Sequence, residues 1–241
     1  MRFNVEIILE KENIPKDKNR MILSYLKHVF QSYDDNFYKS LYEKEINKLK
    51  GFTFSLYMPN CKFTREEIII PEKKIILNFS SSDMQEGIMF YNAILSNIGK
   101  GYPFKENSMT AKNINMVREK NIVDQSVIFK SMSPIVIREH NGDNKKTWYY
   151  SFDEEKGYEI FLNNLKYQLI NEFGDERILD INELRFEVLS NKVTKVKNYS
   201  IVIPTNISVI KIYAKTYILD YIYKSGLGSK RNSGFGMVDI Y

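Results

Sequence analysis

The chain has little cysteine, little histidine and no long apolar run. Its 241 residues include one cysteine, Cys61, and two histidines, His28 and His140. One cysteine cannot form an internal disulfide, and these three residues are too few for a closed Cys/His zinc site. No stretch approaches the roughly 18 apolar residues of a membrane-spanning helix, and the N-terminus does not resemble a signal peptide. We therefore expect a cytoplasmic protein without membrane contact, metal or other cofactor.

The composition is that of a globular protein with a small basic excess. Hydrophobic residues make up 43% of the chain and charged residues 27%, and 35 Lys and Arg face 30 Asp and Glu. The resulting formal charge of +5 suits a polyanionic partner without requiring one. Aromatic residues reach 14%, which serves base stacking and core packing equally well.

The first half of the chain predicts the order β-α-β-β-α-β. Apolar alternation predicts strands, and Ile22, Leu26, Val29, Phe30 and Tyr33 have helical spacing. The strands are expected at 2–10, 51–58, 67–71, 74–80 and 109–119, the helices at 20–33 and from Asp83 to about 95, with a further helical piece at 35–47.

The second half repeats this order. Strands are expected near 127–129 and 135–137, at 184–196 and 207–213 around a turn containing Pro204, and at 234–241, with a hairpin tip at Asn141-Gly142. Helices are expected at 153–173, capped by Asp153, and at 215–224. We therefore predict an α+β protein of two tandem ferredoxin-like (βαββαβ, RRM-like) domains, residues 1–121 and 122–241.

Four of the 11 glycines fall at 226–236, between the last helix and the last strand. Gly226, Gly228, Gly234 and Gly236 permit positive φ, so the turn is expected to expose amides that suit phosphate oxygens, with Lys230 and Arg231 adding charge. The alternative to a phosphate-binding turn is that Gly226 ends the helix as its C-cap and the other glycines form a tight loop before the last strand. A helix-loop-strand order is opposite to that of nucleotide-binding loops, which excludes those sites. The RNA-binding hypothesis depends on this turn lying at the surface.

The segment Gly226-Leu227-Gly228, five residues, then Gly234-Phe235-Gly236 resembles the glycine-rich loop of the RAMP superfamily of RNA-processing proteins. It is most similar to the CRISPR-associated protein 6 endoribonucleases. Three weaker matches occur in that family's order: Met1-Arg2-Phe3, Phe52-Thr53-Phe54-Ser55 and Ser131-Met132-Ser133-Pro134. The resemblance implies tandem ferredoxin-like domains and CRISPR repeat RNA as substrate. A non-catalytic RNA-binding subunit of an effector complex is the alternative, as is a module unrelated to RNA.

The resemblance also implies metal-independent cleavage of precursor CRISPR RNA. The 2′-hydroxyl attacks the scissile phosphate and leaves a 2′,3′-cyclic phosphate and a 5′-hydroxyl, which requires a base, an acid and cations. The family's histidine lies in the first helical region, where His28 falls opposite the apolar stripe; an exposed histidine without function is the alternative. Its tyrosine and lysine suggest Tyr25, Tyr38 or Tyr42 with Lys48 or Lys50. In one alignment with the family, His28 stands where relatives carry the tyrosine and Tyr42 stands where they carry the histidine.

We assign proton transfer to His28, phosphate charge to Lys48 or Lys50 and a positioning hydrogen bond to Tyr42. His140 is expected at a polar hairpin tip, without a catalytic role. Lys192, Lys195 and Lys197 on a predicted hairpin are weaker RNA-binding candidates, with a solvated face as the alternative. The sequence leaves the oligomeric state open; effector-complex subunits and a homodimer are the protein partners considered.

Overall fold

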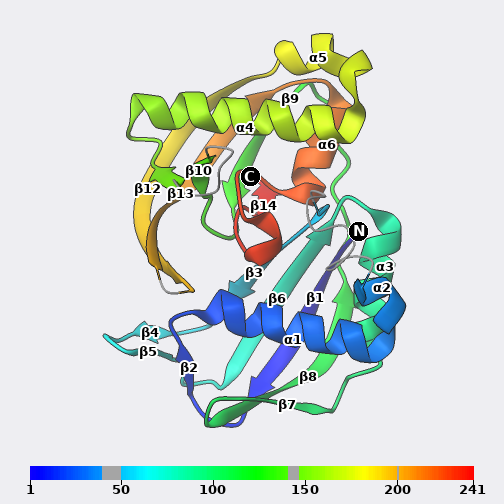
Figure 1. Ribbon diagram of the computed structural model, residues 1–241, viewed down its shortest axis with the longest axis vertical. Coiled ribbons are helices and arrows are strands. Elements are labelled where there is room, and N and C mark those ends of the chain that lie inside the picture. Colours follow the sequence, from blue (N-terminus) through cyan, green and yellow to red (C-terminus); the bar gives the residue numbers. More distant parts are fainter. Residues whose placement is uncertain (40–49, 141–146, 200) are drawn as a thin grey trace.

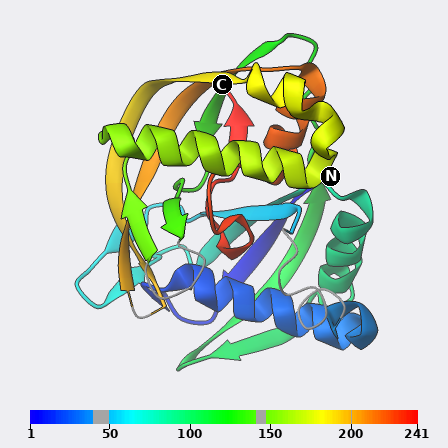
Figure 2. The same ribbon diagram turned by 45° about the horizontal axis from the view of Figure 1, so that its top comes forward.

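The computed structural model describes residues 1–39, 50–140, 147–199 and 201–241. Figure 1 shows two units of sheet and helices stacked along the long axis, with the N-terminal half below and the C-terminal half above. Figure 2 shows α4 (Glu155–Phe173) of the upper unit and α1 (Lys18–Tyr33) of the lower unit on the same side of the molecule, with the C-terminal segment between them.

The first unit is a five-stranded antiparallel sheet with two helices packed on it. The strands lie in the order β3-β6-β1-β8-β7. Their bounds are β1 Arg2–Leu9, β3 Phe52–Tyr57, β6 Lys74–Ser81, β7 Gly101–Phe104 and β8 Asn107–Met116, and the helices are α1 Lys18–Tyr33 and α3 Met84–Leu95. Without the added edge strand β7, this is the βαββαβ order and strand arrangement that the sequence predicted.

Two small additions flank this sheet. The strands β2 (Asn13–Pro15), β5 (Glu67–Ile69) and β4 (Lys62–Phe63) form a separate three-stranded sheet. The sequence predicts the strand at 67–71 that contains β5 but no strand at 13–15, because β2 is too short to show alternation. Of the helical piece expected at 35–47, α2 (Asp35–Lys39) is described, and the rest lies outside the described residues.

The second unit repeats the arrangement with the strand order β12-β13-β9-β14. Its strands are β9 Ser126–Ser131, β12 Arg185–Asn198, β13 Ile201–Tyr213 and β14 Val238–Ile240, and its helices are α4 Glu155–Phe173, α5 Ile178–Asn182 and α6 Thr216–Ser225, with short 3-10 turns η2 Asp175–Arg177 and η3 Arg231–Ser233. The hairpin of β10 (Ile137–His140) and β11 (Thr147–Tyr150) is present, although its predicted tip at 141–142 lies outside the described residues. The boundary predicted at 121/122 falls between β8 and β9.

Alternating side chains build a separate core in each unit. In β1, Phe3, Val5 and Ile7 are buried and face Ile22, Leu26 and other residues of α1 and α3. A second core joins β9, β13, α4 and α6, and a small third cluster of Val136, Ile203 and Phe235 lies beside the glycine segment. Tyr33, predicted on the apolar face, is 42% exposed because it is the last residue of α1.

Two local predictions are wrong. Pro204 lies inside β13 and pairs with Lys195, not in a turn; β9 pairs with β13 only at Val209–Tyr213, so proline is tolerated in this outer part of the strand. Asp153 does not cap α4, since Glu154 holds the N-cap position and the Asp153 carboxylate accepts a hydrogen bond from Asn191.

Candidate functional site

The glycine segment is a tightly folded connection between α6 and β14. All four of its glycines have positive φ, from 69° to 81°. A Cβ at Gly226 would lie 2.5 Å from the carbonyl oxygen of Gly236, and one at Gly236 would overlap the carbonyl of Leu227. The two Gly-x-Gly pairs therefore lie against each other, backbone to backbone, and only glycine allows that approach.

The prediction that this turn exposes its amides is wrong. Leu227 N donates to Gly236 O at 2.8 Å, Gly236 N to Pro134 O at 2.9 Å and Ser229 N to Val136 O at 2.8 Å. Gly226, Gly234 and Gly236 are buried, and Gly228 is half-buried. Because these amides already have internal acceptors, they are unavailable to phosphate oxygens, and the glycines act through packing.

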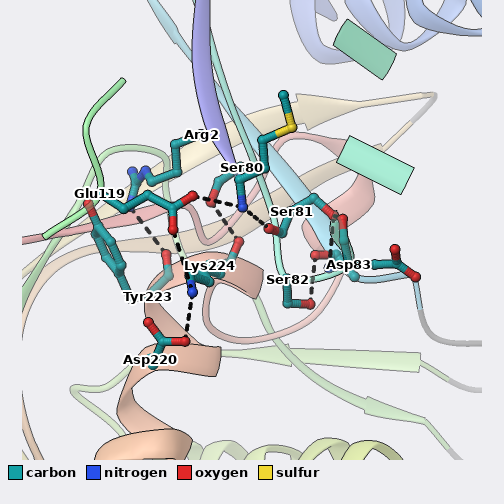
Figure 3. Close-up of polar contacts among 11 residues, drawn as sticks. Arg2, Ser80, Ser81, Ser82, Asp83, Glu119, Asp220, Tyr223 and Lys224 are labelled. Atoms are coloured by element: carbon teal, nitrogen blue, oxygen red, sulfur yellow. Dashed lines mark hydrogen bonds and ion pairs between the residues drawn. The ribbon is translucent and has the colours of Figure 1, made fainter. Parts of the chain in front are cut away.

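Four side chains of the first unit bind carbonyls at the end of α6, in the glycine segment and in β14. Thr53 Oγ1 donates to Phe235 O at 2.8 Å, and Ser80 Oγ to Lys224 O at 2.7 Å. The buried guanidinium of Arg2 donates to Val238 O at 3.0 Å and Tyr223 O at 3.2 Å, and it lies over the Tyr223 ring. Asn19 of α1 donates to Gly234 O at 3.0 Å. Figure 3 shows Arg2 and Ser80 reaching the end of α6.

The three weaker sequence matches converge on the same segment. Arg2 and Thr53 belong to the first two, and in the third Ser133 Oγ accepts from Met237 N at 2.9 Å. Arg2 and Thr53 thus join the first unit to the glycine segment and the residues that flank it, and Ser133 fixes the end of this region within the second unit. The sequence shows these residues as motif positions only, since their partners lie far away in the chain.

Arg231 is buried, so the prediction that it adds charge to an RNA-binding surface is wrong. It is 6% exposed, and its Nη1 lies 3.3 Å from Ser225 Oγ, an acceptor that also receives Gln168 Nε2. Burial lowers the pKa of Arg231, and the nearby Tyr221 and Glu172 counteract this. Its guanidinium therefore links the glycine segment to α6 and α4 inside the molecule.

Lys230 is the half-buried cation of the segment, and its backbone is left-handed with φ 59°. Burial lowers the pKa of Lys230, and the positive charge of Arg138 on β10 lowers it further. Two cations of the second unit are thus close enough to repel each other.

A similar pair lies in the first unit. Lys50, just before β3, is half-buried; burial lowers its pKa, as does Lys27 of α1, while Glu86 raises it. Lys50 thus lies within electrostatic range of Lys27 on α1, a cation that the sequence patterns did not single out. Tyr42 and Lys48 lie outside the described residues.

His28 is exposed on α1, as its helical position predicted. Its ring centroid lies 5.0 Å from that of Tyr102 on β7, and the Tyr102 hydroxyl is 2.8 Å from Ser24 Oγ. Since successive helix residues differ by about 100° around the axis, His28 and Lys27 project in different directions. His140 is exposed at the end of β10, 3.3 Å from Thr147 Oγ1.

Lys192, Lys195 and Lys197 lie exposed on β12, in the hairpin that β12 forms with β13. In Figure 1 this hairpin runs from the upper sheet down to the start of α1. There Arg20 lies 5.1 Å from the ring of Tyr199. The three lysines thus line an element that spans both units.

Comparison with known proteins places the chain in a family. The family model for the C-terminal region of CRISPR-associated protein Cas6 matches residues 117–240, just over half of the chain and the whole glycine segment. The chain belongs to the Cas6 family. It is also 26% identical over 227 residues to a curated Pyrococcus furiosus protein named a CRISPR-associated endoribonuclease-like protein Cas6, a match that covers 87% of this chain and 91% of that one.

Solved Cas6 and RAMP structures share the fold. A Cas6-related protein from Pyrococcus furiosus superposes with a TM-score of 0.82 at 22% identity, covering 100% of this chain and 98% of that one. A RAMP protein described as binding different RNA substrates gives 0.83 at 22% identity, covering 100% and 99%. These likenesses confirm two tandem ferredoxin-like domains. Among the described residues, no helix is long and apolar enough to cross a membrane.

Proposed function

We propose that this Cas6 protein cleaves precursor CRISPR RNA within its repeats, without a metal ion, through attack of a 2′-hydroxyl on the scissile phosphate. The observation that carries the proposal is the family match through the glycine segment, extended by a relative that covers most of the chain and is named endoribonuclease-like. A product with a 2′,3′-cyclic phosphate and a 5′-hydroxyl is expected.

The two pairs of like charges support binding of a phosphate backbone near the glycine segment. Lys230 and Arg138 repel each other in the second unit, and Lys27 and Lys50 in the first. Lys230 precedes η3, which contacts α1, where Asn19 donates to Gly234 O; Lys27 lies eight residues further along the same helix. Cations near each other attract a phosphate, and in the first unit Glu86 offsets part of the repulsion that Lys50 experiences. We therefore assign the RNA phosphate contact to the side chains of Lys230, Arg138, Lys27 and Lys50 instead of the glycine amides.

His28 is the proposed proton-transfer group, and Lys50 the proposed cation for the charge that develops on the phosphate. Histidine titrates near neutral pH and can serve as base or acid. Lys48 remains the alternative to Lys50 as this cation, and Tyr42 remains the proposed positioning group.

The first experiment incubates the purified protein with repeat RNA in EDTA under single-turnover conditions. Cleavage at one position in the repeat is expected, and its products identify the chemistry. Binding without cleavage would instead support the non-catalytic RNA-binding member of the superfamily. Absence of binding at low salt would reject both.

The second experiment compares His28→Ala with His140→Ala. We expect His28→Ala to slow cleavage by about 10²-fold or more with RNA affinity nearly unchanged, because general acid-base catalysis has that magnitude. His140 is also an exposed histidine, on the β10–β11 hairpin, so His140→Ala should cleave at the wild-type rate. A wild-type rate for His28→Ala would remove His28 from the mechanism.

A further inference from the structure

The strand β7 adds an edge to the first sheet beyond the βαββαβ order. It is the outermost strand, next to β8, and its residue Tyr102 lies opposite Met109. Pro103 is tolerated in β7 because an edge strand makes no ladder hydrogen bonds on its outer side. Figure 1 shows β7 along the lower edge of the molecule, below α1. The added strand thus brings Tyr102 to the helix that carries His28.

Three contacts define the place of the Tyr102 side chain. Its hydroxyl lies 2.8 Å from Ser24 Oγ. Its ring meets that of Tyr25 edge-on, with the centroids 5.5 Å apart, and Tyr25 is 1% exposed and belongs to the first core. The third contact is with the exposed imidazole of His28, whose centroid is 5.0 Å away with 40° between the two planes. Tyr102 is therefore an anchored ring beside a solvent-exposed histidine.

The contact restricts the directions that the His28 side chain can take. Ser24 and His28 are four residues apart on α1, so they share one face of the helix, and Tyr102 contacts both. A long side chain on a helix has two common χ1 rotamers. An aromatic contact of this kind favours the rotamer that makes it by about 3- to 10-fold. His28 thus keeps a preferred direction although no core packs around it.

We propose that Tyr102 is a positioning residue for His28, holding the imidazole in the rotamer from which His28 transfers a proton during RNA cleavage. This role rests on the proposed function, which gives the proton transfer to His28. Tyr102 acts through His28 and has no assigned contact with RNA. Orientation matters for the rate because the proton-transfer group must lie within hydrogen-bond distance of the reacting oxygen.

Single-turnover cleavage of repeat RNA by Tyr102→Ala tests the proposal. The cleavage step should slow by about 3- to 10-fold, the size of the lost rotamer preference, while RNA affinity keeps its wild-type value. Tyr102→Phe retains the ring and loses only the hydroxyl contact with Ser24, so it should recover most of the rate. The control is Tyr57→Ala, at a 62% exposed tyrosine on the opposite edge strand β3, and it should cleave like wild type.

The double variant His28→Ala/Tyr102→Ala separates positioning from a general structural effect. Because Tyr102 acts through His28, removing its ring should not slow His28→Ala any further. Equal slowing in both backgrounds, or wild-type cleavage by Tyr102→Ala, would overturn the role of Tyr102 and leave the proposed function intact. Wild-type cleavage by His28→Ala would instead reject the proposed role of His28, and the role of Tyr102 with it.

Proton NMR tests the contact without RNA. The chain has two histidines, so in a His140→Ala background the remaining imidazole signals belong to His28. Tyr102→Ala should shift these signals because it removes a ring 5.0 Å away, and Tyr57→Ala should not. Unchanged His28 signals in Tyr102→Ala would show that the two rings are not in contact and would overturn the proposal.

Discussion

At the scale of single residues, the glycines of Cas6's C-terminal segment are explained by sterics inside the protein. Their positive φ angles and the short distances to Leu227 and Gly236 carbonyls leave no room for a side chain. In the sequence the spaced glycines suggest contact with a ligand, but in this protein they are required because the backbone packs too closely for a side chain.

Substitution at Gly236 tests this explanation. Gly236→Ala should lower the free energy of unfolding by about 3 kcal/mol or more, since the methyl group adds a backbone overlap to an unfavourable φ. Gly99→Ala is the control: Gly99 has φ +80° but nothing within 4 Å of the added Cβ, so about 1 kcal/mol is expected. Urea denaturation measures both, and equal losses would show that φ alone matters.

Lys18 should make stability depend on alkaline pH. Its amino group lies 3.0 Å from Asn19 Oδ1, and burial lowers the pKa of Lys18 from 10.5 to about 8. Between these two values the unfolded chain binds this proton and the folded chain does not, so stability rises with pH. The penalty for burying the charge is therefore complete below pH 8 and disappears toward pH 10.5.

The measurement compares wild type with Lys18→Met by urea denaturation at several pH values from 7 to 10. The advantage of Lys18→Met over wild type should shrink as pH rises from 8 to 10, because releasing the lysine proton on folding costs less free energy as the pH approaches 10.5. A constant difference between the two proteins would contradict the lowered pKa.

At the scale of elements, the β12–β13 hairpin extends well beyond the sheet that anchors it. Thr194 and Thr205 join its strands through hydroxyls 2.9 Å apart, and Tyr199 near the tip lies under Arg20 of α1. The hairpin is thus supported at both ends, which keeps its exposed lysines in place on a surface shared by both units.

Removing a lysine from this hairpin tests whether it binds RNA. Lys195→Ser should weaken binding of repeat RNA and reduce the slope of log K against log salt by about 1, as expected for one phosphate contact. Unfolding should change by less than about 0.5 kcal/mol, since Lys195 is exposed. Lys11→Ser, at an exposed lysine just after β1, is the control and should leave the slope unchanged. Identical slopes for Lys195→Ser and wild type would exclude the contact.

At the scale of the whole molecule, polar donors join the two ferredoxin-like domains through the glycine segment. Arg2, near the start of the chain, donates hydrogen bonds to the carbonyls of Tyr223 and Val238, near its end. Nearby, Lys224 pairs with Asp220 at 2.8 Å and Glu119 at 3.5 Å, as Figure 3 shows. Side-chain donors of the first domain thus satisfy backbone carbonyls of the second.

Arg2→Met should therefore destabilise the protein by about 2–4 kcal/mol, because two buried carbonyls lose a charged donor. Arg65→Met is the control, since the Arg65 side chain is 96% exposed and should contribute less than about 0.5 kcal/mol. Urea denaturation followed by circular dichroism measures both. Equal stability of the two variants would mean that the Arg2 contacts do not hold the domains together.

The sequence by itself determined much of the fold and the family. Helix α3 begins after Asp83 as predicted, with Glu86 N donating to the Asp83 carboxylate at 2.9 Å, because a cap is a contact between near neighbours in the chain. Alternating apolar residues predicted the main strands, because alternation also involves only near neighbours in the chain. The spacing of Gly226 to Gly236 indicated the family. His28 faces solvent because helical periodicity is also local.

Only the tertiary structure decided which groups are available to a ligand. Arg231 looked like a surface cation, yet Ser225, Gln168 and Tyr221 surround it once α4 and α6 pack together. The amides of Gly236 and Ser229 likewise find acceptors at Pro134 and Val136, which lie 102 and 93 residues earlier in the chain. Periodicity and propensity describe neighbours in sequence, whereas burial and hydrogen-bond partners depend on which distant segments meet, and no local pattern encodes that meeting.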